Sequence, residues 1–261
     1  MSTLRQPALF ISHGAPTLAL EHGATARFLR ELGASLPPPA AILCVSAHWE
    51  TSPVSLSANP YPQTIHDFGG FPAPLYDLEY PARGDAQLAA RAAVLLKPLH
   101  GVVQVDARRG FDHGVWVPLM LMFPDAQIPV VSMAVQPHLP AAHHFRLGGL
   151  LAPLRDEGVM ILGSGGATHD LRAFWGQRRE AAPQGYAQVF DDWLVAHVEA
   201  GDTASLVAYE QLGPEAKRNH PTPEHLLPLF VPMGAAQGGR GRVLHRVIEY
   251  GVLAMTAFGW E

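Results

Sequence analysis

Residues 7–14 of the chain read PALFISHG, an apolar run that gives way to a turn sequence containing a histidine. Two further stretches share this pattern: residues 41–48 read AILCVSAH, and residues 159–169 read VMILGSGGATH. Short apolar runs bounded by turn residues are typical of strands buried within a sheet. We therefore expect three buried strands, each closely followed by a histidine.

Segments with helical periodicity lie between the apolar runs, so strands and helices alternate along the chain. Besides the three runs above, we expect strands at Val54–Ala58, Val102–Val105 and Ile128–Val135, and one or two closing strands within Val243–Phe258. We expect helices at Glu21–Leu36, Asp85–Leu99, Val117–Met122, Pro140–Asp156, Tyr186–Ala200, Thr203–Leu212 and Leu226–Ala236. This alternation predicts an α/β fold: a single three-layer domain over residues 1–261, with a central mostly parallel or mixed sheet flanked by helices.

The composition argues against several classes of protein. Of the 261 residues, 48% are hydrophobic and 16% are charged, whereas disordered chains are rich in charge and poor in apolar residues. The net charge of −5 argues against a nucleic-acid partner. The single cysteine, Cys44, excludes a disulfide within the chain and a zinc site built from cysteines.

The distribution of apolar residues also bears on the location of the protein. No apolar run reaches the roughly 18 residues that a membrane-spanning helix requires. The apolar stretch near the N-terminus is too short for a secretory signal peptide. We therefore expect a soluble cytoplasmic protein without a membrane partner, either a monomer or a small homo-oligomer.

The 14 histidines are the most unusual feature of the composition, because histidine is the commonest metal ligand and titrates near neutral pH. His13, His48 and His169 each follow a predicted strand. In open α/β sheets, ligands bind beyond the carboxyl ends of the strands. These three imidazoles therefore converge if their strands are parallel neighbours.

Two further histidines lie where a helix is predicted to begin. In residues 220–225, HPTPEH, Thr222 suits an N-cap and Pro223 suits the first helical position. His225 is then expected in the first turn of the helix, with its ring directed at whatever the helix N-terminus faces. His113 lies in the loop that leads into the apolar helix predicted at Val117–Met122.

Other groups near these histidines have both a functional and a plain structural interpretation. Asp67 and Glu50 are possible carboxylate ligands, or only a loop cap and a solvated charge. Gly163–Gly166 could hold a phosphate, but the run lacks a following lysine and the spacing of a dinucleotide loop. Three neutral imidazoles without a thiolate suit Zn(II), Fe(II) or copper. From the residues alone, an iron oxygenase and a zinc enzyme with bound water both remain open.

Six segments of the chain, in the same order, resemble the class III extradiol ring-cleavage dioxygenases, and most closely their 4,5-DOPA dioxygenase extradiol branch. Each segment is a weak signal alone, but together they span nearly the whole chain. The segments are Ser12-His13-Gly14; Ser46-Ala47-His48-Trp49-Glu50; His66-Asp67-Phe68 with Gly70-Phe71-Pro72; Asp112-His113-Gly114 with Trp116-Val117-Pro118-Leu119; Gly163-Ser164-Gly165-Gly166 with His169-Asp170-Leu171; and His220-Pro221-Thr222-Pro223-Glu224-His225.

The resemblance implies a single α/β domain with one divalent metal ion at one end of the sheet. It implies that His13, His48 and His225 bind this ion. More distant members of the wider family use a glutamate as the third ligand, which leaves Glu224 as the alternative to His225. His169 is expected to be the acid/base histidine, or a fourth metal ligand.

Further residues of the matching segments are expected to act on the substrate. His113 is expected to be a second catalytic residue that handles dioxygen or the substrate. The candidates for substrate binding are His66, Phe71, His220 and Trp49. The expected reaction opens a catechol ring of the DOPA type with O2, next to the diol. Fe(II) is expected for activity, and Zn(II) is expected to be found bound because zinc outcompetes Fe(II) at nitrogen and oxygen sites.

Two other functions are compatible with the residues. A zinc-dependent hydrolase would use a metal-bound hydroxide, would work without oxygen and would leave the ring intact. A non-catalytic binding protein of this fold would lose nothing but stability in a His169→Ala variant. Oxygen-dependent ring opening separates the dioxygenase from both.

Overall fold

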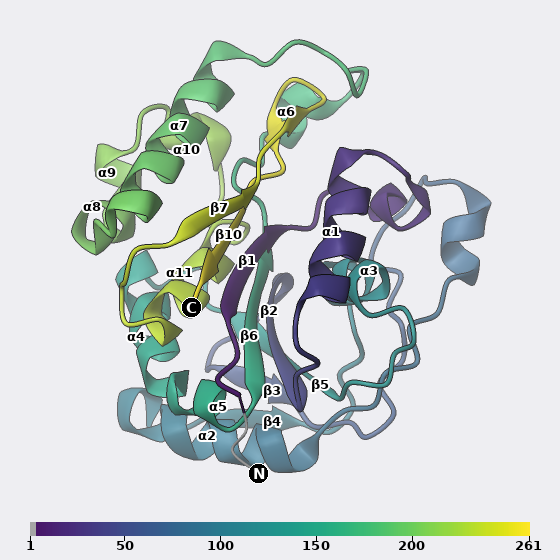
Figure 1. Ribbon diagram of the computed structural model, residues 1–261, viewed down its shortest axis with the longest axis vertical. Coiled ribbons are helices and arrows are strands. Elements are labelled where there is room, and N and C mark those ends of the chain that lie inside the picture. Colours follow the sequence, from purple (N-terminus) through teal and green to yellow (C-terminus); the bar gives the residue numbers. More distant parts are fainter. Residues whose placement is uncertain (1–3) are drawn as a thin grey trace.

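Within residues 4–261, which the computed structural model describes, the main sheet has eight strands in the order β4-β3-β5-β2-β6-β1-β10-β7 (Figure 1). Its strands are β1 (Ala8–Ser12), β2 (Ala41–Glu50), β3 (Ser55–Ser57), β4 (Gln104–Asp106), β5 (Val130–Val135), β6 (Val159–Gly165), β7 (Arg242–His245) and β10 (Ala257–Trp260). The central strands β5, β2, β6 and β1 run parallel, whereas β3 and β10 are antiparallel to β5 and β1. The predicted α/β fold with a mixed sheet is confirmed.

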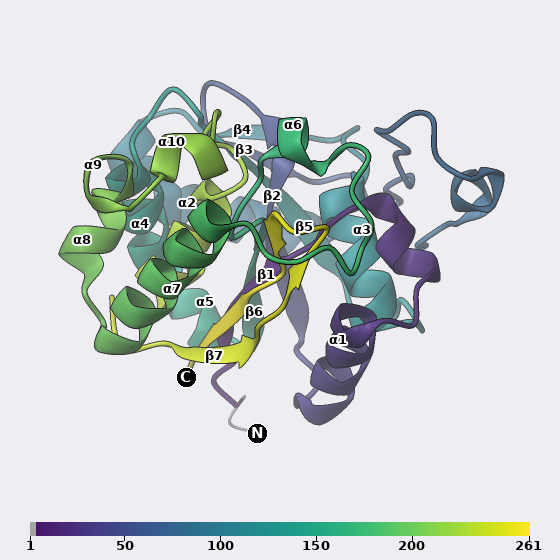
Figure 2. The same cartoon turned by 90° about the horizontal axis from the view of Figure 1, so that it is seen from above.

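Helices cover both faces of this sheet (Figure 1, Figure 2). One face carries α1 (Ala24–Ser35) and α3 (His113–Met122), and the other carries α2 (Ala86–His100), α4 (Ala141–Leu151), α7 (Gly185–Ala200) and α11 (Leu227–Ala235). Successive side chains of a strand point to opposite faces. In β1, Ala8 and Phe10 therefore enter one hydrophobic core, and Leu9 and Ile11 enter the other.

Several predicted elements are divided into shorter ones. The helix expected at Pro140–Asp156 breaks after α4, because Pro153 has no N–H to continue the ladder. The closing region contains β8 (Ile248–Glu249) and β9 (Leu253–Ala254), which pair with each other outside the main sheet. The remaining short helices are η1 (Pro16–Leu20), η2 (Ala73–Asp77), α5 (Pro153–Asp156), α6 (Leu171–Phe174), α8 (Thr203–Val207), α9 (Tyr209–Leu212) and α10 (Ala216–Asn219). No helix in the described part of the chain has both the length and the apolar character to cross a membrane.

Helix α11 is buried along its whole length, as expected for a sequence that is apolar on every side. It begins at Leu227, with Pro228 in its first turn. The prediction that Thr222 caps this helix and that Pro223 opens it is therefore wrong, because Pro228 supplies the start signal instead. His225 lies in the turn before the helix, not in its first turn.

Candidate active site

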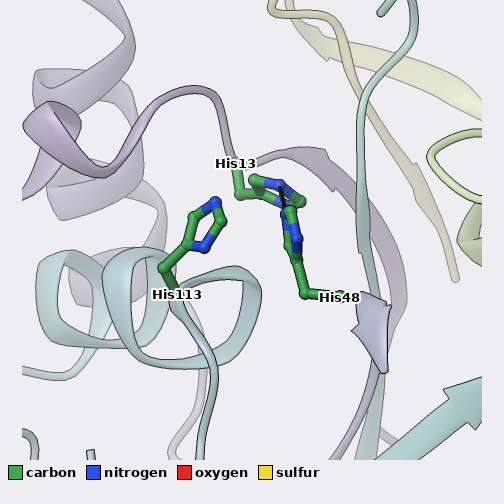
Figure 3. A group of neighbouring side chains, drawn as sticks. All are labelled: His13, His48 and His113. Atoms are coloured by element: carbon green, nitrogen blue, oxygen red, sulfur yellow. Dashed lines mark hydrogen bonds between the residues drawn. The ribbon is translucent and has the colours of Figure 1, made fainter. Parts of the chain in front are cut away.

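The ends of the central parallel strands bring two of the predicted histidines together. His13 follows β1 directly, and its backbone N–H donates to the carbonyl oxygen of Gly165 at the end of β6, at 3.0 Å. His48 lies inside β2, where pairing with β5 shifts register between Ser46 and Glu50. Such irregularities re-aim side chains at the ends of sheets. His48 Nε2 lies 2.9 Å from His13 Nε2 (Figure 3).

The glycine-rich run after β6 brings His225 to the same place. A Cβ atom on Gly163 would lie 2.2 Å from the carbonyl oxygen of Pro228, and one on Gly165 would lie 2.0 Å from that of His225. Only glycine permits this approach of two backbones. The N–H of Gly166 also donates to the His225 carbonyl oxygen at 2.8 Å. The run therefore seats the His225 turn against β6, which accounts for these glycines without a phosphate.

Hydrogen bonds fix which nitrogen of His13 and His225 carries the proton. The Ser164 hydroxyl donates to the carbonyl oxygen of Gly114, so it accepts from His13 Nδ1 at 3.0 Å. The Glu224 carboxylate accepts from His225 Nδ1 at 2.9 Å. Both rings therefore keep a lone pair on Nε2, the arrangement in which a supporting acceptor prepares a histidine for metal binding.

The Nε2 atoms of His13, His48 and His225, here termed the Nε2 cluster, include two Nε2–Nε2 distances of the length found between ligands of one ion. His48 Nε2 lies 2.9 Å from that of His13 and 3.3 Å from that of His225. A single hydrogen on His48 Nε2 can satisfy only one of the two facing lone pairs. Two nitrogens bound at about 2.1 Å to one cation lie about 3.0–3.4 Å apart for angles of about 90–110°. The donor set therefore fits a divalent metal.

Burial keeps these imidazoles neutral, which ligand binding requires. Burial, followed by the neighbouring histidines, lowers the pKa of His13 and of His225 well below the ordinary 6.5. Burial is also the main cause that lowers the pKa of His48 to about 3, with His113 the next cause. The pKa of His169 is lowered to about 3, again mainly by burial.

Asp67 holds His113 against the same cluster. Its Oδ1 accepts from the backbone N–H of His113 and its Oδ2 accepts from the ring Nδ1, each at 2.9 Å. Burial alone would raise the pKa of Asp67, but the hydrogen bonds from His113 outweigh it and lower that pKa to about 2. Asp67 Oδ2 also lies 3.6 Å from His48 Nδ1. The structure thus has Asp67 supporting histidines, where the sequence had left open a direct ligand and a plain structural role.

Among residues 4–261, two groups of side chains have ligand atoms close enough to hold a metal. In one, the ligand atoms of His13, His48 and His113 all lie within 4.8 Å of one another (Figure 3). The other consists of His169, Glu224 and His225. The two groups adjoin, because His225 Nε2 contacts His48 Nε2 at 3.3 Å.

His169 lies beside the Nε2 cluster. Its ring stacks on that of His225, with 3.3 Å between centroids and 11° between planes. Its backbone N–H donates to the carbonyl oxygen of Asn219 at 2.9 Å, which ties the end of β6 to the segment that leads to His225. The convergence predicted for the three histidines at strand ends is therefore present.

A cavity of about 640 Å³ opens over these histidines. It is lined by His13, His48, His113, His169, His225 and Phe71, all predicted site residues. Sequence reasoning missed other lining residues, notably Phe174, Trp175, Leu253 and Met255. They come from the end of α6, from the residue that follows it and from the segment around β9, and no local sequence pattern marks them as part of a site. Ser164, which supports His13, is not among the predicted site residues, although it lies within the glycine-rich run of residues 163–166.

Three predicted substrate-binding residues lie outside the lining of the cavity. His66 Nε2 lies 3.0 Å from the carbonyl oxygen of Leu78, and His220 Nε2 lies 3.0 Å from that of Ala167. Trp49 is 7% exposed and packs beneath the guanidinium of Arg109. Each of these rings is held by its surroundings and is not presented to the cavity. His220 thereby supports the segment just before His169.

Comparison with known proteins gives consistent matches over most of the chain. The family model described as the catalytic LigB subunit of aromatic ring-opening dioxygenase matches residues 7–258. The chain is 42% identical to the 4,5-DOPA dioxygenase extradiol of Beta vulgaris, covering 95% of this chain and 94% of that protein. It is 43% identical to the protein of that name from Escherichia coli (strain K12), covering 98% and 95%.

Similarity extends to a third relative and to a solved structure. The chain is 36% identical to the dioxygenase tasH of Hapsidospora irregularis, covering 88% of this chain and 78% of that protein. The crystal structure of the uncharacterized protein JW3007 from Escherichia coli K12 superposes with a TM-score of 0.82 at 36% identity. That match covers 98% of this chain and the whole of the other.

Proposed function

We infer the activity from one premise: this chain belongs to the family of the catalytic LigB subunit of aromatic ring-opening dioxygenases. It is an extradiol ring-cleaving dioxygenase. We propose that residues 1–261 form one catalytic domain that opens a DOPA-like catechol with O2, at the bond next to the diol. The observation that carries the proposal is the Nε2 cluster at the floor of the cavity.

In this proposal, His13, His48 and His225 hold one divalent metal ion. The support for this assignment comes from the two short Nε2–Nε2 distances to His48 and from the acceptors Ser164 and Glu224, which leave Nε2 lone pairs on His13 and His225. When bound, an Fe(II) ion would acidify the catechol and bring the diol and dioxygen together in one place. We propose Fe(II) for activity and expect Zn(II) to be found bound after purification.

The two flanking histidines are proposed to handle protons. His169, neutral and stacked on His225, can accept a phenolic proton at a ring nitrogen and return it to the product. His113 has its Nδ1 proton committed to Asp67, so its Nε2 is left as an acceptor on the cavity side. The hydrogen bonds to Asp67 prevent the His113 ring from rotating away from the cavity.

Two phenylalanines, Phe68 and Phe71, are proposed to orient the catechol ring and to exclude water. Phe68 and Phe71 both line the cavity and contact each other edge-to-face, with centroids 5.4 Å apart. Aromatic faces favour offset or edge contacts with a bound ring. We propose that the catechol lies against this pair with its diol directed at the Nε2 cluster.

The experiment is to load the metal-free protein with Fe(II) under anaerobic conditions and then to add air and a panel of catechols. The dioxygenase assignment predicts consumption of O2 together with a ring-opened product that absorbs visible light. Protein loaded with Zn(II) is the control and is expected to give neither signal. Substrate turnover without oxygen, with the ring intact, would instead indicate a zinc-dependent hydrolase. None of the relatives above is named a hydrolase.

A further inference from the structure

The lining of the cavity carries negative charge without a positive counterpart. Its acidic residues are Glu50, Asp67 and Glu224, and the described residues that line it include neither lysine nor arginine. Arg109 lies near His48, but its guanidinium is held by Asp112 Oδ2 at 2.6 Å and covers the Trp49 ring. That charge is therefore compensated within the wall of the protein.

The three carboxylates differ in the number of hydrogen bonds that they accept within the protein. Asp67 accepts two hydrogen bonds from His113. Glu224 accepts from His225 Nδ1 and from the Thr222 hydroxyl. Glu50 has no side-chain hydrogen bond or ion pair within residues 4–261, and it is exposed at the carboxyl end of β2. It is therefore free to receive a charged group from a ligand.

Geometry places Glu50 where the side chain of a bound catechol would emerge. The Nε2 cluster forms the buried floor, since His13 is 2% exposed and His225 is 5% exposed. In the proposed function the diol is directed at that floor. A substituent on the far side of the ring must then point to the open mouth, which Glu50 lines.

We propose that the cavity selects catechols whose side chain carries an ammonium group, and that Glu50 is the residue that binds this group. The inference rests on the proposed function and names its substrate class. Even with a divalent cation and a catecholate bound, the three carboxylates leave the cavity with excess negative charge. Coulomb attraction therefore favours a cationic substituent, and repulsion disfavours a substituent that carries only a carboxylate.

Four catechols of similar size separate the contributions of charge: 2-(3,4-dihydroxyphenyl)ethylamine, DOPA, neutral 4-ethylcatechol and 3-(3,4-dihydroxyphenyl)propionate. We expect kcat/KM to be highest for the amine and lowest for the propionate, with the difference between them at least about tenfold and smaller at high salt. Equal values for the amine and the propionate would overturn the proposal.

The variant Glu50→Gln keeps the shape of the side chain and removes its charge. We expect the ratio of kcat/KM for the amine to that for 4-ethylcatechol to fall about tenfold. The matched control is Glu31→Gln, at an exposed position on α1, and its ratio should equal that of the unmodified protein. An unchanged ratio in Glu50→Gln would also overturn the proposal.

Binding measurements keep this test separate from the test of activity. Calorimetric titration of the Zn(II)-loaded protein under anaerobic conditions gives the affinity of each catechol without turnover. Tighter binding of the amine than of the propionate, lost in Glu50→Gln, supports the selection by charge even if no ring is opened. Conversely, if 4-ethylcatechol is opened and the amine binds no better than the propionate, the dioxygenase assignment stands and the selection by charge falls.

Discussion

The floor and the mouth of the cavity are built in different ways. At the floor, His13 and His225 are 2% and 5% exposed, and supporting acceptors fix their rings. At the mouth, Leu171 and Trp175 are 42% and 69% exposed and belong to α6 and the residue after it. The floor is thus preorganised for one chemistry, whereas the mouth can vary without disturbing it. Substitutions at the floor should therefore affect metal binding and turnover, whereas substitutions at the mouth should affect substrate affinity.

The largest effect is expected from His48→Ala, which removes the central atom of the Nε2 cluster. Loss of a residue that merely supports a ligand costs about 10–100-fold in metal affinity or activity. Loss of a ligand should exceed that range, so the variant should retain almost no iron and show no measurable ring opening. Elemental analysis of metal per chain measures this. The control is His138→Ala, an exposed histidine away from the cavity. Full metal occupancy in His48→Ala would refute the ligand assignment.

Acid stability tests the buried support behind the floor. Burial, the first cause, lowers the pKa of His220 from 6.5 to about 4. The folded state therefore resists a proton that the unfolded chain accepts, and the free energy of unfolding falls as the pH drops from about 6.5 towards about 4. Across this pH range, the lowered pKa of His220 reduces the free energy of unfolding by about 3 kcal/mol.

The variant His220→Gln has no imidazole at this position and should lose that component. Denaturant unfolding of the metal-free protein should then give a smaller difference between about pH 7 and about pH 4.5 for the variant than for the original chain. Any constant change in stability caused by the substitution cancels in this comparison. Parallel pH curves would show that the group is not buried in its neutral form.

Asp67→Asn tests whether the hydrogen bonds from His113 to Asp67 serve metal binding or proton handling. Asparagine has one oxygen and an NH2 donor, so it cannot accept from the backbone N–H and from Nδ1 at two separate oxygens as the carboxylate does. We expect kcat to fall about tenfold, the lower end of the range for supporting residues, with metal content unchanged. Asp125→Asn, at an exposed loop position, is the control. A loss of metal in Asp67→Asn would contradict this expectation and would show that Asp67 supports metal binding, through His113 or through His48, whose Nδ1 lies 3.6 Å from Oδ2.

The smallest effect is expected at the mouth, from Trp175→Ala. A partly exposed aromatic contact contributes roughly 0.5–1 kcal/mol, so KM should rise about two- to fivefold while kcat and metal content stay the same. Trp175→Phe keeps an aromatic surface and should restore most of the affinity. A fall in kcat without a change in KM would contradict the division between floor and mouth.

The floor could be predicted because it follows from strand topology. Apolar runs that end near His13, His48 and His169 predict parallel strands, and the carboxyl ends of such strands meet at one edge. His225 was assigned by resemblance, and its expected place in a helix turn was wrong. The physical reason for its position is the close approach of two backbones at Gly163 and Gly165, which the local pattern of residues around 220–225 does not reveal.

The mouth could not be predicted, because its residues meet only through long-range packing. Leu253 lies in β9 and Met255 directly after it, far along the chain from Phe71, and nothing in their local sequence links them to the cavity. His66 and Trp49, for which a matching segment predicted contact with the substrate, show the converse situation. In the folded chain both rings pack against other groups and lie outside the lining of the cavity.

The most direct test of the central claim is the position of the bound metal. A crystal structure of the Fe(II)-loaded protein, prepared without oxygen and with anomalous scattering recorded at the iron edge, would locate the ion. The account predicts bonds of about 2.1 Å, as for zinc and imidazole, to the Nε2 atoms of His13, His48 and His225, with His113 outside bonding distance. An ion bound by His113 in place of His225 would contradict it.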